Sequence, residues 1–187
     1  VTEIESKAFY NNTNLVSVTL PNTLKTIGKE AFRGCTKLAA VEIPDSVTSI
    51  GTYCFYGCTS LQTVKWSSKT VIIDEYMFQG DNALTTVSGI DNVTSIGDRA
   101  FSGCSKLERI VFPGGLTTIA GYAFYYCSSL PDIVLPETVT TLSSYAFQGC
   151  SSAKIIIVPG GLYTLSSYAF YNCSAVTDIY IPNSINT

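Results

Sequence analysis

Seven cysteines are the side chains of this 187-residue sequence with the most chemistry open to them. A thiolate can act as a nucleophile, a metal ligand or one half of a disulfide. Cys54 stands apart from the other six, which recur at intervals of 23 or 46 residues: Cys35, Cys58, Cys104, Cys127, Cys150 and Cys173. Because the chain has no histidine and no C-x-x-C pair, Cys54 and Cys58 would supply two zinc ligands at most. We expect neither a metal site nor a cofactor.

The recurring cysteines leave two interpretations open. If equivalent positions lie in neighbouring turns of a stacked structure, their Cα separation would permit a disulfide. The count is odd, however, and side chains in a ladder point the same way. Free cysteine is also among the most buried residue types and packs as a small apolar side chain. We therefore favour buried free thiols over disulfides.

Carboxylates are the other candidates for chemistry, and the chain has fourteen of them. They are scattered among the expected turns and strand faces, and no motif fixes a pair of them. General acid and base catalysis needs two such groups held in a cleft, and the absence of histidine removes the commonest catalytic base. We expect a protein that is not an enzyme.

The elements that position these residues repeat with a fixed period. Phenylalanine returns every 23 residues along the whole chain, at Phe9, Phe32, Phe55, Phe78, Phe101, Phe124, Phe147 and Phe170. A period of that length without insertions is typical of a solenoid, in which one short unit stacks on the next. We call each 23-residue unit a rung, and the sequence predicts about eight of them in one array that spans residues 1–187.

Each rung contains a strand pattern and a helix-like pattern. Nine residues after each phenylalanine stands a β-branched residue between more variable neighbours, as in Val41-Glu42-Ile43, which predicts a short strand with one buried face. Proline closes most of these strands. The Ile-Gly-x-x-Ala-Phe stretch that ends at each recurring phenylalanine has apolar residues at i, i+4 and i+5, which fits a short helical turn. The prediction is an α/β repeat solenoid with one continuous parallel sheet of eight strands and helical turns opposite it.

The fuller pattern is Leu-x-x-Val-x-Ile-Pro-x-x-Val-x-x-Ile-Gly-x-x-Ala-Phe-x-Gly-Cys, best seen around Ile27–Pro44. It resembles the BspA-like leucine-rich repeats over essentially the whole chain. The resemblance implies the right-handed superhelix of leucine-rich repeats. It also implies surface-exposed bacterial or protist proteins that act in adhesion and partner binding and have no catalytic residues.

The composition of the chain limits which partners and which cellular location we expect. The net charge is −3 and no Lys/Arg run exists, so a nucleic-acid partner is not expected. No apolar run reaches the length of about 18 residues that membrane insertion requires. Both ends lack the polar cap of a finished array, which favours a chain that is incomplete at both ends. With the resemblance, these observations predict an extracellular or cell-surface location.

The outward face of the strands in the C-terminal half carries the strongest functional signal. Ten residues after each phenylalanine the side chain is polar in four rungs and then apolar or aromatic in four. Such a stripe on a soluble protein marks a contact site or an aggregation hazard. The stripe and its neighbouring outward column define the predicted partner-binding residues: Arg109, Val111, Asp132, Val134, Ile155, Ile157, Asp178 and Tyr180. Burial under a neighbouring domain of a parent protein is the alternative explanation.

The predicted function is a non-catalytic protein-binding scaffold from a cell-surface, adhesin-like protein. Its partner would be a host or extracellular protein, and self-association through the apolar strand face is also possible. The alternative is a structural spacer, or an accessory binding module of a larger multidomain secreted protein. Two partial tyrosine ladders flank the phenylalanine column, and we interpret them as packing with recognition as the minority alternative.

Two departures from the repeat stand out. In the strand column that normally carries leucine or isoleucine, the order Trp66, Gly89, Phe112 predicts that the glycine makes room for two bulky neighbours. In the cysteine column, Asp81 replaces the thiol.

Overall fold

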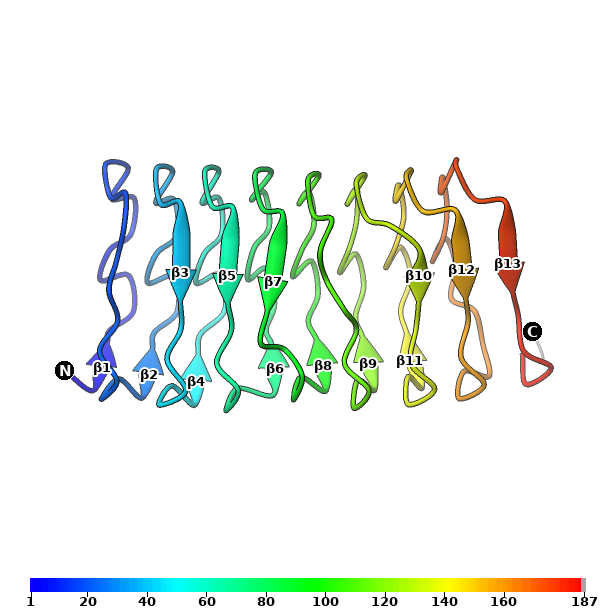
Figure 1. Cartoon of the computed structure of the whole chain (residues 1–187), viewed down its shortest axis with the longest axis horizontal. Helices are drawn as coiled ribbons and strands as arrows, with labels where there is room; N and C mark the ends of the chain where they lie inside the picture. Colours follow the sequence, from blue (N-terminus) through cyan, green and yellow to red (C-terminus); the bar gives the residue numbers. More distant parts are fainter. Residues whose placement is uncertain (186–187) are drawn as a thin grey trace.

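The phenylalanine column is the core of the protein. The computed structural model describes residues 1–185 as a row of stacked rungs (Figure 1). Consecutive phenylalanine rings lie nearly parallel from Phe9 to Phe170, with centroids 5.0 to 5.7 Å apart. The six rings from Phe32 to Phe147 are completely buried. The predicted parallel solenoid of about eight rungs is confirmed. The last residues of the predicted array, 186–187, lie outside the described part.

Two rows of short parallel strands run along the solenoid. Row A contains β3 (Ala40–Glu42), β5 (Thr63–Lys65), β7 (Thr86–Ser88), β10 (Ile133–Val134), β12 (Ile155–Ile157) and β13 (Asp178–Tyr180). Row B contains β1 (Glu3–Ile4), β2 (Thr26–Ile27), β4 (Ser49–Ile50), β6 (Ile72–Ile73), β8 (Ser95–Ile96), β9 (Thr118–Ile119) and β11 (Thr141–Leu142). Every pair is parallel with a register of 23 residues, as in Val41 beside Val64. Row A follows the predicted strand pattern, whereas row B was not predicted as strands, because its isoleucines begin the stretch that was expected to form helical turns.

The predicted helical turns are wrong in detail, because residues 1–185 contain no helix. Two residues before each phenylalanine, the backbone is left-handed, with φ between 52° and 63° in all eight rungs. A right-handed helix cannot continue through such a residue. The phenylalanine N–H groups also bond to the next rung, as from Phe32 to the Cys54 carbonyl at 2.9 Å. The i, i+4, i+5 spacing therefore arises from tight turns whose apolar side chains all face the core.

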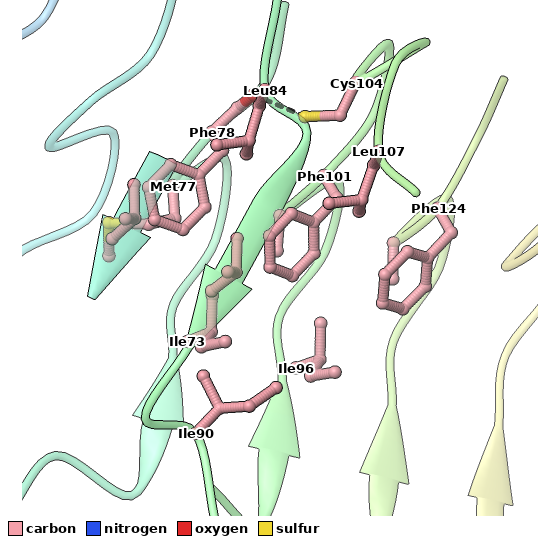
Figure 2. Close-up of a cluster of buried hydrophobic side chains, with 14 of the residues drawn as sticks. Ile73, Met77, Phe78, Leu84, Ile90, Ile96, Phe101, Cys104, Leu107 and Phe124 are labelled. Carbon is pink, nitrogen blue, oxygen red and sulfur yellow. Dashed lines mark hydrogen bonds between the residues drawn. The ribbon is translucent and has the colours of Figure 1, made fainter. Parts of the chain in front are cut away.

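A row of thiols runs beside the phenylalanines. Each recurring cysteine donates its S–H to a phenylalanine carbonyl of the preceding rung, at 3.1 to 3.3 Å. Figure 2 shows this bond from Cys104 to Phe78, beside the stacked rings of Phe78, Phe101 and Phe124. All seven cysteines are free, and all but Cys173 are fully buried. Asp81 occupies the same row and is completely buried.

Each strand row is interrupted once, so the predicted continuous sheet of eight strands is wrong. Row A consists of β3-β5-β7 and β10-β12-β13, and row B consists of β1-β2-β4 and β6-β8-β9-β11. Figure 1 shows β7 and β10 separated by one slanting segment that leads down to β9. The row A interruption has a cause in the sequence. Pro131 stands where Glu108 and Lys154 stand in the adjacent rungs, and it has no N–H to donate to the preceding rung.

The interruption of row B lies between β4 and β6. The stretch that leads to β6 carries Ser67 and Thr70 in place of the usual proline and valine. Both hydroxyls are buried and donate to backbone carbonyls, Ser67 to Val47 at 2.7 Å and Thr70 to Ser67 at 3.0 Å. Val71 and Ile72, which follow them, are about half exposed. The departures of this rung from the repeat therefore coincide with its separation from β4.

Gly89 is required for a backbone reason that differs from the predicted one. Its φ is +75°, and a Cβ atom there would lie 2.7 Å from the carbonyl oxygen of Trp66. The Trp66 and Phe112 rings pack instead against phenylalanine rings, Trp66 against Phe78 at 5.9 Å and Phe112 against Phe124 at 5.4 Å. The glycine therefore avoids strain and a backbone clash, and it does not mainly accommodate side-chain volume.

We expect Gly89→Ala to lower the free energy of unfolding by about 2 to 3 kcal/mol, measured by urea denaturation. Gly57→Ala is the matched control, because Gly57 has φ +69° and nothing within 4 Å of a Cβ atom. The control should show only the left-handed backbone cost of about 1 kcal/mol. Equal losses in the two variants would show that the approach to Trp66 is not what demands a glycine.

Candidate binding surface

The outward side chains of β10, β12 and β13 form one row across three rungs. The register places Val134 beside Ile157, and Ile157 beside Tyr180. Val134 is 51% exposed and Tyr180 is 59% exposed, whereas Ile157 is half-buried between them. Three of the predicted partner-binding residues thus lie side by side on a regular ladder.

Tyr180 also borders a groove of about 490 Å³ at the edge of this row. The groove continues over Val158, Gly160 and Pro182, and Glu137 supplies its charge. Its Gly160 N–H donates to the Glu137 carboxylate at 2.8 Å, which fixes that side chain across two rungs. An aromatic ring beside a shaped depression is the usual arrangement of an interface anchor.

The neighbouring outward column has a different composition. Ile155 lies beside Asp178 in the β12–β13 ladder. The Asp132 carboxylate accepts hydrogen bonds from the backbone N–H groups of Lys154, at 3.1 Å, and Ile155, at 3.0 Å. Asp132 therefore caps the start of β12, a structural role that the sequence pattern did not indicate.

Arg109 and Val111 lie apart from the other predicted residues. Arg109 forms a single isolated bridge to Thr86, and the residues around Val111 pair with no strand of residues 1–185. Val111 is 81% exposed. The predicted stripe is therefore continuous from Val134 to Tyr180 and interrupted before Val134. The proline at position 131 was the sequence signal that could have revealed this interruption.

Two further grooves lie along row A. One of about 560 Å³ follows the interruption, between β7 and the segment 108–111, with Pro131 at its border. The other, of about 820 Å³, lies between residues 18–22 and the chain around β3, and the paired Glu42 and Lys65 are part of its wall. Sequence reasoning identified neither, because a groove depends on how far neighbouring rungs separate.

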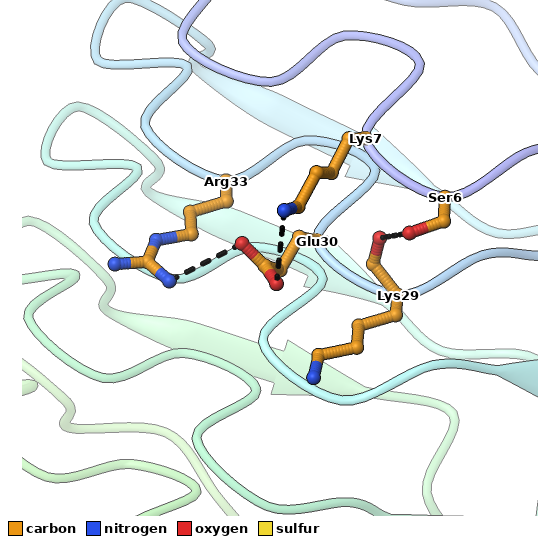
Figure 3. A network of polar contacts seen from close by, with 5 residues as sticks. All are labelled: Ser6, Lys7, Lys29, Glu30 and Arg33. Carbon is orange, nitrogen blue, oxygen red and sulfur yellow. Dashed lines mark hydrogen bonds and ion pairs between the residues drawn. The ribbon is translucent and has the colours of Figure 1, made fainter.

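The turn side of the N-terminal rungs is polar and cationic. Glu30 is nearly buried and lies between Lys7, at 4.0 Å, and Arg33, at 3.3 Å (Figure 3). The Arg33 guanidinium also lies 4.6 Å from the centre of the Tyr56 ring. Such cation–π contacts hold the arginine flat against the surface.

The tyrosines two residues before the phenylalanines form stacks. Tyr122, Tyr145 and Tyr168 lie nearly parallel, with centroids 4.7 and 4.9 Å apart, and the Arg99 guanidinium lies 4.3 Å from the Tyr122 centroid. Stacking of this kind contributes about 0.5 to 1.5 kcal/mol per pair and helps to offset the left-handed backbone at these positions. The contacts agree with the interpretation of this ladder as packing.

Burial keeps the thiols of the core protonated. Burial raises the pKa of the Cys54, Cys58, Cys104 and Cys127 thiols well above the usual value, so they stay protonated at neutral pH. A protonated buried thiol is a poor nucleophile. Among residues 1–185, no three histidine, cysteine or acidic side chains gather as metal ligands would. The same residues form no helix of the length and apolarity that crossing a bilayer requires.

The repeat matches a known family of sequences. The family described as "BspA type Leucine rich repeat region" matches residues 2–130 and 81–187 with six copies. No curated protein matches the chain.

Three solved structures with the same architecture come from bacteria. A leucine-rich repeat protein from Bacteroides ovatus has a TM-score of 0.80 and 28% identity, over 94% of this chain and 48% of that one. One from Eubacterium ventriosum has a TM-score of 0.68 and 31% identity, over 80% of this chain and 43% of that one. A leucine rich cell surface protein from Faecalibacterium prausnitzii has a TM-score of 0.53 and 26% identity, over 96% of this chain and 76% of that one.

This chain thus spans less than half of the first two relatives. The aligned phenylalanines, the thiol row and the parallel ladders are the structural counterpart of the matched repeat. The chain belongs to the family of BspA type leucine-rich repeat proteins.

Proposed function

We propose that this chain is a non-catalytic protein-binding scaffold from the ectodomain of a cell-surface, adhesin-like protein. The observation that carries the proposal is the row of Val134, Ile157 and Tyr180 on the outward side of β10, β12 and β13. Apolar and aromatic side chains that are exposed together usually mark a contact surface, and a few such anchors supply most of the binding energy.

The geometry of the row supports a role in binding. Its three backbones are held by parallel ladders above the phenylalanine column, so the anchors keep their relative positions without a partner. A preorganised surface loses little conformational entropy on binding. Asp178 and Ile155 lie in the next outward column and would contact the rim of a partner. The cell-surface location is supported by the relative from Faecalibacterium prausnitzii, which is described as a cell surface protein.

The double substitution Val134→Asp and Ile157→Asp tests this proposal. We expect the labelled wild-type chain to bind cultured epithelial cells saturably, and the double variant to bind about tenfold less or worse, because two buried charges would oppose the contact. Thr19→Asp is the matched control, because Thr19 is exposed in the same outward column, ten residues after Phe9. Sedimentation velocity on the same samples measures self-association through the face.

A spacer would give a different result. In that case neither the double variant nor Thr19→Asp would change the amount of chain on the cells or its sedimentation. Circular dichroism melts of the three proteins establish that the substitutions act on binding and leave the fold intact, since the replaced side chains are mainly outside the core.

A further inference from the structure

The interruption of row A leaves unpaired several backbone groups that form hydrogen bonds in the regular strand pairs. In regular pairs, the residue eleven positions after phenylalanine donates its N–H to the outward residue of the next rung. These bonds run from Ile43 to Lys65 at 2.9 Å, Trp66 to Ser88 at 2.8 Å, Leu135 to Ile157 at 3.3 Å and Val158 to Tyr180 at 3.0 Å. Among residues 1–185, the equivalent bonds from Gly89 to Val111 and from Phe112 to Val134 are absent at the interruption, and the one from Leu20 to Glu42 is absent in the first rung.

β7 and the segment 109–112 are joined by a single bridge and do not pair beyond it. At one end Arg109 donates to the Thr85 carbonyl at 3.0 Å, and Val87 donates to the Arg109 carbonyl at 3.2 Å. Beyond this bridge Gly89 has a left-handed backbone, and the segment that follows the bridge slants toward β9 (Figure 1). Pro131 removes the corresponding donor on the far side. The separation is therefore encoded on both flanks of the segment 109–112.

The result is an open groove with an unused strand edge. Within residues 1–185, the backbone N–H and C=O groups of Ile110, Val111 and Phe112 form no hydrogen bond with protein atoms. The groove holds about 560 Å³, and Val111 in its wall is almost fully exposed. Unpaired strand groups are a template for another extended chain, because alternating donors and acceptors fit only an extended backbone.

The charge of the groove lining limits which peptide segments would complement it. Asp91 and Glu108 line the groove, Arg109 is the single cation in its wall, and none of the three forms an ion pair within residues 1–185. The lining therefore carries a net charge of about −1 at neutral pH. A complementary segment carries a basic residue to meet the excess carboxylate and an apolar residue to cover Val111.

We propose that the groove between β7 and the segment 108–111 binds an extended peptide segment of a partner protein as an added strand, with a basic and an apolar side chain facing the groove. This site extends the proposed binding function to a second place on the solenoid. This site can be tested independently of the row of Val134, Ile157 and Tyr180, because it uses backbone groups on the other side of the interruption.

The probe is a fluorescein-labelled peptide with the sequence of residues 61–67, Leu-Gln-Thr-Val-Lys-Trp-Ser. This sequence contains β5, which already pairs in parallel with β7, and it offers both valine and lysine. Fluorescence anisotropy should show saturable binding to the wild-type chain. Two further peptides carry N-methyl groups on alternate backbone amides, each peptide on a different alternate set. They keep the side chains and lose backbone donors, and at least one should bind about tenfold more weakly than the unmodified peptide.

Val111→Asp and Val134→Asp are the matched protein variants. Both side chains are exposed in the same outward column, so neither substitution should unfold the chain. Val111→Asp should weaken peptide binding about tenfold, and Val134→Asp should leave it unchanged. Amide exchange at Gly89 and Val111 should slow when the peptide is bound.

Three results would overturn the proposal: no saturable binding up to about 1 mM peptide, binding of both N-methylated peptides as tight as that of the unmodified peptide, or equal effects of the two protein variants. A dimer that Val111→Asp dissociates and the peptide does not compete with would assign the groove to a second copy of the chain instead. Loss of cell binding by the Val134 and Ile157 variant, with peptide binding intact, would support the first site and leave the peptide result independent of it.

Discussion

Asp81→Cys is expected to raise the free energy of unfolding at neutral pH by about 3 kcal/mol. The Asp81 side chain is completely buried, and neither carboxylate oxygen has a hydrogen-bond partner among the described residues. It occupies the row in which Cys58 donates its S–H to the Phe32 carbonyl. A cysteine at position 81 can donate in the same way to Phe55, and it removes a carboxyl group that burial disfavours in its charged form.

The size of this stabilisation should depend on pH in a defined direction. Burial raises the pKa of Asp81 well above its ordinary value of 3.8. The folded protein therefore holds the proton more tightly than the unfolded chain does. The protonated carboxyl's contribution to stability is complete below about pH 4 and is lost, at about 1.4 kcal/mol per pH unit, as the pH rises toward the folded-state pKa.

The measurement is urea denaturation of the wild type and Asp81→Cys between pH 4 and pH 8. The advantage of the variant should grow as the pH rises, while shifts of other carboxylates, such as the lowered pKa of Asp45 that accepts the Ser68 N–H, cancel between the two proteins. Asp81→Asn is the control, because a neutral amide does not titrate and its difference from the cysteine variant should be constant. A flat difference between wild type and Asp81→Cys would contradict a raised pKa.

Phe101→Ala should lower the free energy of unfolding by about 4 kcal/mol. The ring is fully buried and lies 5.3 Å from Phe78 and 5.1 Å from Phe124. The substitution leaves a cavity and removes two stacking contacts at once. Because rungs contact only their neighbours, the cavity also weakens the coupling between the two halves of the array, and the urea transition should broaden.

Phe9→Ala provides the comparison for this variant. Phe9 belongs to the same column, is only partly buried and stacks on a single ring, that of Phe32 at 5.1 Å. We expect a loss of about 2 kcal/mol and no broadening. Equal losses for the two phenylalanines would mean that stability is not distributed by position along the column.

The interruption of row A has consequences for both proposed sites. It isolates β10-β12-β13 as a separate three-stranded ladder that carries the exposed apolar row, and it opens the groove beside β7. Pro131 and Gly89 are therefore functional candidates through their effect on the backbone. Their backbones determine which N–H and C=O groups pair between rungs and which remain available to another chain.

The sequence by itself determined the repeat, the inner column and the alternation of buried and outward side chains. Phe32 and Val64 return at a fixed spacing, and inward positions must be apolar wherever one unit stacks on the next. The outward positions of Val134, Ile157 and Tyr180 followed from the same alternation, because side chains of a strand point to opposite faces in turn. These properties depend on a residue's place in its own rung.

Only the tertiary structure decided which backbone groups meet between rungs. The missing N–H of Pro131 matters because a carbonyl 23 residues earlier lies opposite it, and Gly89 matters because of its approach to Trp66. The helical prediction failed for the same reason. The residue two positions before each phenylalanine has a left-handed backbone, and the phenylalanine N–H bonds to a carbonyl of the next rung, which the sequence of a single rung does not show. Hydrogen bonding joins groups that are far apart in sequence, so its gaps, and the grooves they open, appear only once the rungs are stacked.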